Sequence, residues 1–317
     1  MSTDVKNEPE IIFPDVAVNT YKPKNPVEVP IVENRIATMQ SSPNFIRHIS
    51  FDVSGTELEG NVRAGQSIGI IPDGLTERDG KPAKVRLYSV AAPTRGEDGE
   101  GKIISTTVKR LVDEDPESLN LFTGLCSNYL CGLKPGETVK MTGPNGKKFV
   151  LPENAEDFNY IFFATGTGIA PFRGMVTDLL EKGIKNDIVL TFGTPYRSDL
   201  LYYDFFQELD DKHDNFHYLK SISREDPRED GSKHYVQYKI LDAWELMNPI
   251  LVKENTLIYI CGLKGMELGL YKILAQQGYK GYLKISEEIA DKPPHEWKTE
   301  DLKKNVRPSK RTFLEVY

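Results

Sequence analysis

The sequence predicts two domains, an antiparallel β-barrel followed by an α/β domain with a parallel sheet. The chain has 317 residues, which is more than one hydrophobic core ordinarily organises. Short β-branched and aromatic runs separated by Gly, Pro, Asp and Asn fill residues 32–152, as in an antiparallel barrel. From residue 153 to 317, apolar strands alternate with amphipathic helices, which predicts a parallel, Rossmann-like sheet.

Residues 1–31 are predicted to form an extended tail. They are rich in Pro, Asn, Glu and Lys and show neither helical nor strand periodicity. They also lack the apolar core of a secretory signal and the Arg- and Ser-rich composition of a transit peptide. We therefore expect a cytoplasmic location.

Composition argues against several classes of site and partner. The formal net charge of −7 argues against nucleic acid as the main partner. No apolar run approaches the roughly 18 residues that cross a bilayer, so no membrane span is predicted. The three cysteines are an odd number, which suits a reducing compartment. Cys126 and Cys131 lack a second ligand pair at metal-site spacing, so we predict no zinc or iron–sulfur site.

In the barrel domain the predicted strands are residues 45–51, 67–71, 85–90, 103–108 and 138–142. In the α/β domain they are residues 160–164, 188–192, 216–220 and 256–261, with helices at 171–183, 204–209, 236–247 and 266–277. The first of these helices has one apolar face, formed by Phe172, Met175, Val176, Leu179 and Leu180. Gly183 is its stop signal.

A glycine-rich turn at residues 166–171, Gly-Thr-Gly-Ile-Ala-Pro, follows the first α/β strand and opens its helix. Such a turn lets the backbone approach a phosphate, and the helix N-terminus attracts anionic oxygens. Pro171 suits the first turn of a helix. The second strand ends in Gly193-Thr-Pro, so the acidic residue that binds a ribose in NAD-type folds is missing. The alternative is a structural turn without a ligand.

A second polar group follows the third α/β strand. Arg and Lys that converge with hydroxyls suit a 2′-phosphate, and an aromatic ring suits adenine stacking. The residues of this group are Ser223, Arg224, Lys233, Tyr235 and Gln237. They favour NADPH over NADH; the alternative is a solvated polar loop.

Two segments of the barrel domain could hold a flavin. In Arg86-Leu87-Tyr88-Ser89, alternation places Arg86 and Tyr88 on one side of the strand. A guanidinium can hold a pyrophosphate, a phenol can stack on an isoalloxazine ring, and a hydroxyl can hydrogen-bond the flavin N5. Residues 124–128, Gly-Leu-Cys-Ser-Asn, offer exposed N–H donors. The alternatives are an ordinary strand and a helix N-terminus capped by Ser127.

Seven segments that occur in one order carry a family resemblance. They are residues 86–89, 108–112, 124–136, 164–173, 222–225, 259–267 and 315–317. Together they resemble the plant-type (plastidic) class of ferredoxin–NADP reductases, from about residue 33 to the end. With no transit segment in view, a bacterial member is expected. The chain departs from the pattern at Asp113, where many relatives have a Tyr that helps to hold the FAD adenine.

The resemblance implies an FAD in the barrel domain. It places Arg86 on the pyrophosphate, Tyr88 on one flavin face and Ser89 close to N5. Further flavin contacts are expected from Leu87, Lys109, Gly124, Leu125, Cys126 and Ser127.

The resemblance also implies an NADP(H) site in the α/β domain. Thr167 and Gly168 look like pyrophosphate ligands, and the group around Arg224 looks like the 2′-phosphate and adenine site. Cys261 and Glu315 resemble residues beside the nicotinamide, and Tyr317 resembles a terminal ring that covers the other flavin face. Pro171, Gly262, Leu263 and Met266 complete the expected coenzyme contacts. The expected catalytic residues are Ser89, Cys261, Glu315 and Tyr317.

The implied activity is hydride exchange between NADPH and FAD, coupled to single-electron exchange with an acidic carrier such as ferredoxin or flavodoxin. Candidates for a basic docking surface are Lys81, Lys84, Lys109 and Arg110, and the run Lys298, Lys303, Lys304, Arg307, Lys310 and Arg311. For that run the alternative is a solvated helix face. Two other functions stay open: a dedicated reductase component of an oxygenase or epoxidase, and a non-catalytic nucleotide-binding subunit. We expect a monomer.

Overall fold

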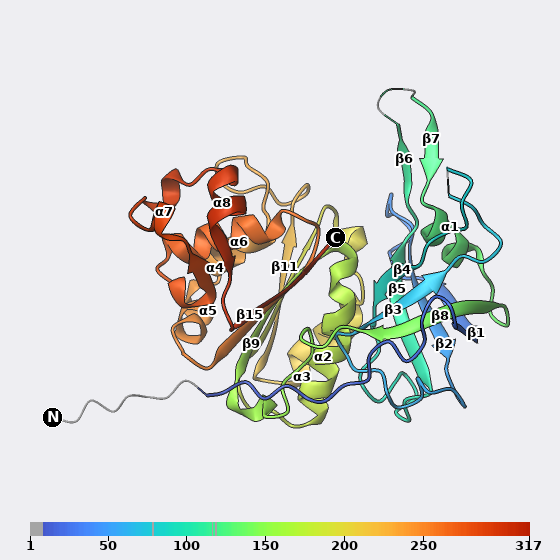
Figure 1. Ribbon diagram of the computed structural model, residues 1–317. Coiled ribbons are helices and arrows are strands. Elements are labelled where there is room, and N and C mark those ends of the chain that lie inside the picture. The colour runs from blue at the N-terminus through green and yellow to red at the C-terminus, as the bar shows by residue number, and fades with distance from the viewer. Residues whose placement is uncertain (1–8, 78, 116, 118) are drawn as a thin grey trace.

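The computed structural model describes residues 9–77, 79–115, 117 and 119–317. An antiparallel sheet occupies the N-terminal part of the chain and a parallel sheet the C-terminal part, with the C-terminus between them (Figure 1). The predicted fold class is confirmed. No helix of the described residues is long and apolar enough to cross a membrane.

The antiparallel sheet has six strands in the order β4-β3-β8-β1-β2-β5. Their bounds are β1 Val27–Ile36, β2 Ile46–Asp52, β3 Ser67–Ile71, β4 Arg86–Ser89, β5 Ile103–Lys109 and β8 Thr138–Asn145. A bridge between Val90 and Thr106 joins the two edges. The sheet thus closes into a barrel, and helix α1 (Leu125–Gly132) packs Leu130 into its core.

Strand β1 corrects the prediction of an extended tail for residues 27–31. These residues begin a strand that pairs with β8 on one side and later with β2 on the other. Pro30 concealed the alternation of Val27, Val29 and Ile31, because a proline ordinarily argues against a central strand. Here the register against β2 shifts just after Ile31, and an irregularity of this kind is where a sheet accommodates proline.

A hairpin that was not predicted projects from the barrel beside α1 (Figure 1). It consists of β6 (Val112–Glu114) and β7 (Leu121–Thr123). Asp113 pairs directly with Phe122 in its register.

The parallel sheet has the order β11-β10-β9-β12-β15. Its strands are β9 Asn159–Thr165, β10 Ile188–Thr194, β11 Phe216–Ile222, β12 Thr256–Gly262 and β15 Thr312–Val316. The α-helices of this part are α2 Ala170–Glu181, α3 Tyr203–Lys212, α4 Lys239–Asp242, α5 Trp244–Leu251, α6 Met266–Gln276, α7 Glu287–Ala290 and α8 Thr299–Asn305. A small antiparallel pair joins β13 (Leu283–Ile285) to β14 (Val306–Pro308).

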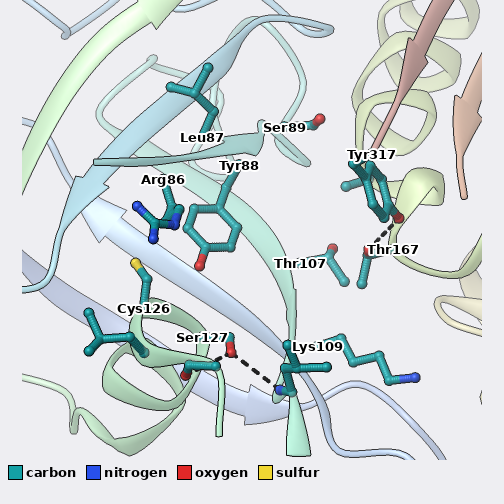
Figure 2. Close-up of a pocket in the computed structure, with 14 residues that line it drawn as sticks. Arg86, Leu87, Tyr88, Ser89, Thr107, Lys109, Cys126, Ser127, Thr167 and Tyr317 are labelled. Carbon is teal, nitrogen blue, oxygen red and sulfur yellow. Dashed lines mark hydrogen bonds between the residues drawn. The ribbon is translucent and has the colours of Figure 1, made fainter. Parts of the chain in front are cut away.

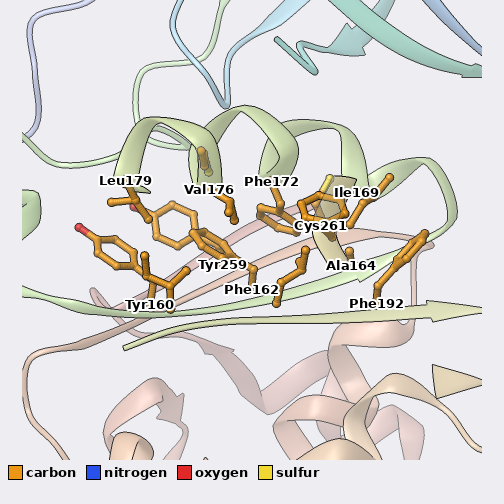
Figure 3. Close-up of a cluster of buried hydrophobic side chains, with 14 of the residues drawn as sticks. Tyr160, Phe162, Ala164, Ile169, Phe172, Val176, Leu179, Phe192, Tyr259 and Cys261 are labelled. Carbon is orange, nitrogen blue, oxygen red and sulfur yellow. The ribbon is translucent and has the colours of Figure 1, made fainter. Parts of the chain in front are cut away.

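Helices cover both faces of the parallel sheet. In β9, Tyr160 and Phe162 belong to the cluster beneath α2, whereas Ile161 and Phe163 belong to the cluster that includes α5 and α6. The predicted apolar face of α2 is buried at Phe172, Met175, Val176 and Leu179 (Figure 3). The helix predicted at residues 236–247 is broken into a 3-10 turn, α4 and α5, because Ala243 leaves the helical conformation.

Candidate functional site

A cavity of about 390 Å³ lies between the barrel and the α/β domain. The barrel side is formed by β4, the end of β5 and the start of α1, and the other side by the glycine-rich turn and the C-terminus (Figure 2). The residues that line it are Arg86, Leu87, Tyr88, Ser89, Thr107, Lys109, Leu111, Gly124, Leu125, Cys126, Ser127, Thr167, Ala170 and Tyr317. All of the predicted flavin contacts are therefore brought to one cavity.

The short strand β4 presents its side chains as the alternation predicted. Arg86 and Tyr88 point toward α1 and Cys126, Leu87 points away, and Ser89 ends the strand on the side of Tyr317 (Figure 2). The Arg86 guanidinium is 2.9 Å from the Glu77 carboxylate, so an anionic ligand would compete with Glu77. Burial, followed by the neighbouring Cys126, raises the pKa of Tyr88, which keeps the phenol neutral.

The start of α1 is suited to an anion. Gly124 is the N-cap, and a Cβ there would lie 2.7 Å from Ser127 Oγ, so only glycine fits without a shift. The first turn contains no acidic residue, which leaves the positive end of the helix uncompensated. Ser127 is not the cap, contrary to the alternative considered above; it lies inside the helix and accepts a hydrogen bond from Leu111 N at 3.2 Å.

Three of the predicted catalytic residues meet at the junction of the domains. Cys261 in β12 and Glu315 in β15 are directly paired in register. Burial raises the pKa of Glu315 to about 7, and hydrogen bonding from Ser89 opposes that shift. Burial and the charge of Glu315 raise the pKa of the Cys261 thiol. Hydrogen bonding from Ser89 opposes this rise as well. A serine from the barrel thus interacts with a carboxyl and a thiol from the α/β domain.

Tyr317, the fourth predicted catalytic residue, is fixed at both its main chain and its ring. Its N–H donates to Gly262 O at 3.1 Å, and its carbonyl accepts from Lys264 N at 3.0 Å. Its hydroxyl lies 2.5 Å from Thr167 Oγ1. The residue as a whole is 58% exposed, and its ring faces the cavity from the side opposite Tyr88 (Figure 2). The Thr167 hydroxyl is therefore already hydrogen-bonded to the Tyr317 hydroxyl.

The glycine-rich turn sits against the residues just described. A Cβ on Gly168 would lie 2.2 Å from the Cys261 carbonyl, so glycine is needed for this close approach. Pro171 occupies the first turn of α2 and is buried. Behind the turn, Thr165 Oγ1 accepts from Leu263 N at 3.0 Å and contacts Met266 Sδ at 3.1 Å. Gly262, Leu263 and Met266 thus support the turn and lie outside the residues that line the cavity.

The predicted 2′-phosphate residues form a second group, separate from the cavity. Ser223 N donates to Thr194 O at 2.8 Å, which ties the end of β11 to the end of β10. Arg224 donates to the Tyr196 hydroxyl at 2.7 Å, and its guanidinium lies 5.4 Å from the centre of that ring. Lys233 and Tyr235 are exposed on the loop that precedes the 3-10 turn at Val236–Tyr238. Gln237 faces inward, against Gly269 of α6.

Several residues of these sites were missed by sequence reasoning. Thr107 lies two residues before Lys109 in β5, so the alternation of the strand was the signal that would have found it. Leu111 follows the end of that strand. Ala170 opens α2 directly after the glycine-rich turn. Tyr196 lies just after the end of β10. This strand was predicted to end without the acidic residue of NAD-type folds, but no role was predicted for Tyr196.

The two candidate basic surfaces differ in their position. Lys109, from the barrel group, lines the cavity. In the C-terminal run, Lys304 pairs with Glu288 at 2.9 Å, and Arg311 donates to the carbonyls of Lys253 and Glu254. Helix α8, which carries part of this run, lies on the side of the α/β domain away from the barrel (Figure 1). These contacts favour a structural role for Arg311.

The chemistry of the cavity fits a flavin dinucleotide. A guanidinium, an ammonium group and the helix N-terminus provide donors for a pyrophosphate, and two aromatic rings face the space between them. Among the described residues, no group of three or more His, Cys, Asp or Glu side chains could hold a metal ion.

Comparisons with known proteins match both parts of the chain. Residues 162–271 match the family model described as the oxidoreductase NAD-binding domain. The chain is 41% identical to a ferredoxin–NADP reductase of Spirulina sp, over 81% of this chain and 88% of the relative. It is 37% identical to the chloroplastic leaf isozyme 1 of ferredoxin–NADP reductase from Arabidopsis thaliana, over 95% of this chain and 80% of the relative. The solved structure of ferredoxin–NADP⁺ reductase from Plasmodium falciparum aligns with a TM-score of 0.70 at 24% identity, over 97% of this chain and all of that one (100%).

Proposed function

The chain belongs to the ferredoxin–NADP reductase family, and from this premise we propose how its residues carry out electron transfer between NADPH and ferredoxin. The enzyme uses FAD and NADP(H). The observation that carries the proposal is the cavity that Ser89 and its barrel neighbours share with Thr167 and Tyr317 of the α/β domain, where Cys261 and Glu315 are paired in the adjoining strands. This junction is where a coenzyme on one domain reaches a cofactor on the other.

Arg86, Lys109 and the first N–H groups of α1 would hold the FAD pyrophosphate, since they supply positive charge to the barrel side of the cavity. Tyr88 and Tyr317 would hold the isoalloxazine ring between them. Bound FAD supplies the conversion between a two-electron hydride and single electrons. The protein supplies the positions of the groups around it.

On the coenzyme side, Thr167 and Gly168 would bind the NADP(H) pyrophosphate, and Glu315 would hold or release a proton close to neutral pH. A coenzyme that uses the Thr167 hydroxyl must first replace its bond to Tyr317. The position of Tyr317 therefore opposes coenzyme binding in the free enzyme.

Coenzyme selectivity gives a direct prediction for Arg224, whose exposed guanidinium lies beside the Tyr196 ring. Arg224→Ala should weaken NADPH use by about 10- to 100-fold, because a charge-assisted hydrogen bond to a 2′-phosphate is lost. NADH use should hardly change. Steady-state kcat/KM for both coenzymes is the measurement, with Arg197→Ala, on the same side of the domain and paired with Asp226, as the control. Equal losses with both coenzymes would make Arg224 a structural residue.

For the acceptor, we propose that ferredoxin docks on the barrel residues Lys81, Lys84, Lys109 and Arg110, of which Lys109 lines the cavity. An acidic carrier would be steered there by charge, with an association rate that falls as salt rises. Flavodoxin is a second acidic carrier with the same requirement. We further propose that the enzyme works as a monomer in the cytoplasm.

One experiment tests the proposed function as a whole. The purified protein should be yellow, should reduce an artificial acceptor with NADPH, and should reduce cytochrome c only when ferredoxin or flavodoxin is added. A colourless protein that binds nucleotide without turnover would support the non-catalytic alternative. Activity that requires the ferredoxin of one oxygenase system would support the dedicated reductase component instead.

A further inference from the structure

The N-terminal segment 9–21 crosses from the α/β domain to the barrel, and we call it the strap (Figure 1). Its first part is hydrogen-bonded to the linker that joins the two sheets. Ile12 N donates to Asn154 Oδ1 at 3.1 Å, and Ile12 O accepts from Glu153 N at 2.8 Å. Asn154 Nδ2 also donates to Glu10 O at 3.0 Å. The strap is thus fixed at the α/β end.

The second part of the strap is fixed to the barrel. Asn19 N donates to Pro144 O at 2.8 Å. The buried Gln66 amide donates to both Ala17 O and Gly146 O, each at 2.9 Å. A segment with little periodicity in its sequence is therefore bonded at both ends, and its middle is held against the domain boundary.

Phe13 lies in the middle of the strap and packs on the C-terminal strand. Its ring contacts that of Phe313 edge to face, with centroids 5.7 Å apart and an interplanar angle of 82°. Phe313 in turn stacks on Tyr259 at 4.5 Å. Phe313 is therefore held between a buried ring of β12 and a ring of the strap.

Among the described residues, strand β15 is an edge strand of the parallel sheet and pairs with β12 on one side. Side chains alternate along a strand, so Phe313, Glu315 and Tyr317 project from the same face. The face on which Phe13 packs is consequently the face that carries a junction carboxyl and the terminal ring. Tyr317 uses this position to bond Thr167.

We propose that Phe13 is a positioning residue. It stabilises β15 in the state where the Tyr317 hydroxyl is hydrogen-bonded to the Thr167 hydroxyl. The inference rests on the proposed function, because its consequence concerns NADP(H) binding. Without Phe13, β15 is held less firmly and Tyr317 leaves Thr167 more readily. The binding-competent state is then more populated, and the apparent affinity for the coenzyme rises in proportion.

Phe13→Ala should therefore bind NADP⁺ about 3- to 10-fold more tightly than the wild type, the range expected when one edge-to-face aromatic contact is lost. The measurement is titration of the oxidised, FAD-loaded enzyme with NADP⁺, followed by the flavin difference spectrum and by calorimetry. Amide hydrogen exchange in residues 312–317 of the coenzyme-free enzyme should become faster in the same variant.

Two further variants separate positioning from general stability. Phe13→Tyr keeps the ring and should retain the wild-type NADP⁺ affinity. Val16→Ala shortens a buried side chain at the part of the strap that meets the barrel, and should lower the melting temperature without tightening NADP⁺ binding. An unchanged or weaker affinity in Phe13→Ala, an equal change in Val16→Ala, or unaltered exchange in residues 312–317 would each overturn the proposal. Failure of the wild type to bind NADP⁺ would instead contradict the proposed function.

Discussion

Ser89→Val is expected to slow reduction of the bound FAD by NADPH by about 100-fold or more while FAD stays bound. Valine is nearly the same size as serine but cannot hydrogen-bond. Ser89 is the one of the three junction residues that comes from the barrel, and its hydroxyl interacts with both Glu315 and Cys261. The substitution therefore removes the polar link between the two halves of the site while it preserves the strand.

The same substitution should alter the pH dependence of the reaction. Burial raises the pKa of Glu315 and hydrogen bonding from Ser89 opposes that rise, with a net value of about 7. Without that bond the pKa of Glu315 should rise further, so the protonated form persists to higher pH. Stopped-flow reduction by NADPH between about pH 6 and 9 measures both the rate and the shift.

Ser67→Val is the matched control, because Ser67 is paired directly with Ser89 in the register of β3 and β4. Ser67 does not line the cavity, so its replacement disturbs the same strand pair without removing the hydroxyl at the junction. We expect its rate to stay close to that of the wild type. A Ser89→Val enzyme with an unchanged rate and pH profile would remove Ser89 from the mechanism.

Local patterns in the sequence predicted the direction of the side chains in residues 86–89 and the place of the glycine-rich turn. Alternation placed Arg86 and Tyr88 on one side of their strand, and the family resemblance assigned residues 86–89 to one flavin site. The glycine-rich turn could be placed because a helix that follows a parallel strand always begins at the carboxyl edge of the sheet. In both cases the local geometry depends on fewer than about ten consecutive residues.

The features that local patterns did not give depend on pairings between distant segments. Nothing near Glu315 shows that it lies opposite Cys261; that follows from the register of β15 on β12. Strand β1 was missed at residues 27–31 because its alternation is interrupted by Pro30, and its place is set by two partner strands. The contact of Phe13 with Phe313 joins the two ends of the chain, which no local periodicity can reveal. Family resemblance, not local pattern, gave the role expected for Glu315.

The domain interface offers the other large expected effect, through Arg173 of α2. This side chain follows the phosphate turn by a few residues and reaches the barrel, where it forms two hydrogen bonds to Glu97, of 2.6 and 2.9 Å. Its guanidinium also lies 5.2 Å from the centre of the Tyr202 ring. The Tyr202 hydroxyl bonds Thr107 at 2.6 Å and His48 at 2.9 Å, so the contact continues to the wall of the cavity.

Arg173→Ala should destabilise the enzyme by about 3 kcal/mol near neutral pH, because it leaves the Glu97 carboxylate largely buried without its cation. That corresponds to a melting temperature lower by about 6–12 °C. The measurement is the increase in flavin fluorescence as FAD is released on heating. Burial raises the pKa of Glu97, and hydrogen bonding and charge from Arg173 outweigh this and lower it overall. Without Arg173 that pKa should rise, so Glu97 takes up a proton more readily in acid and the stability deficit should shrink as the pH falls from neutral.

Arg197→Ala provides the comparison that makes this prediction specific. Arg197 also forms an ion pair, with Asp226, but its side chain is 63% exposed, whereas that of Arg173 is 14% exposed. Exposed pairs contribute less than about 1 kcal/mol, so the melting temperature of Arg197→Ala should fall by no more than about 2–4 °C. If the two variants lost the same stability at every pH, the prediction would be wrong, and the ion pair between Arg173 and Glu97 would contribute no more than an exposed one. The orientation of the domains would then have to be maintained by the apolar packing of α2 against Ala64 and Ala92 at Gly174, where a Cβ would lie 2.2 Å from the Ala92 carbonyl.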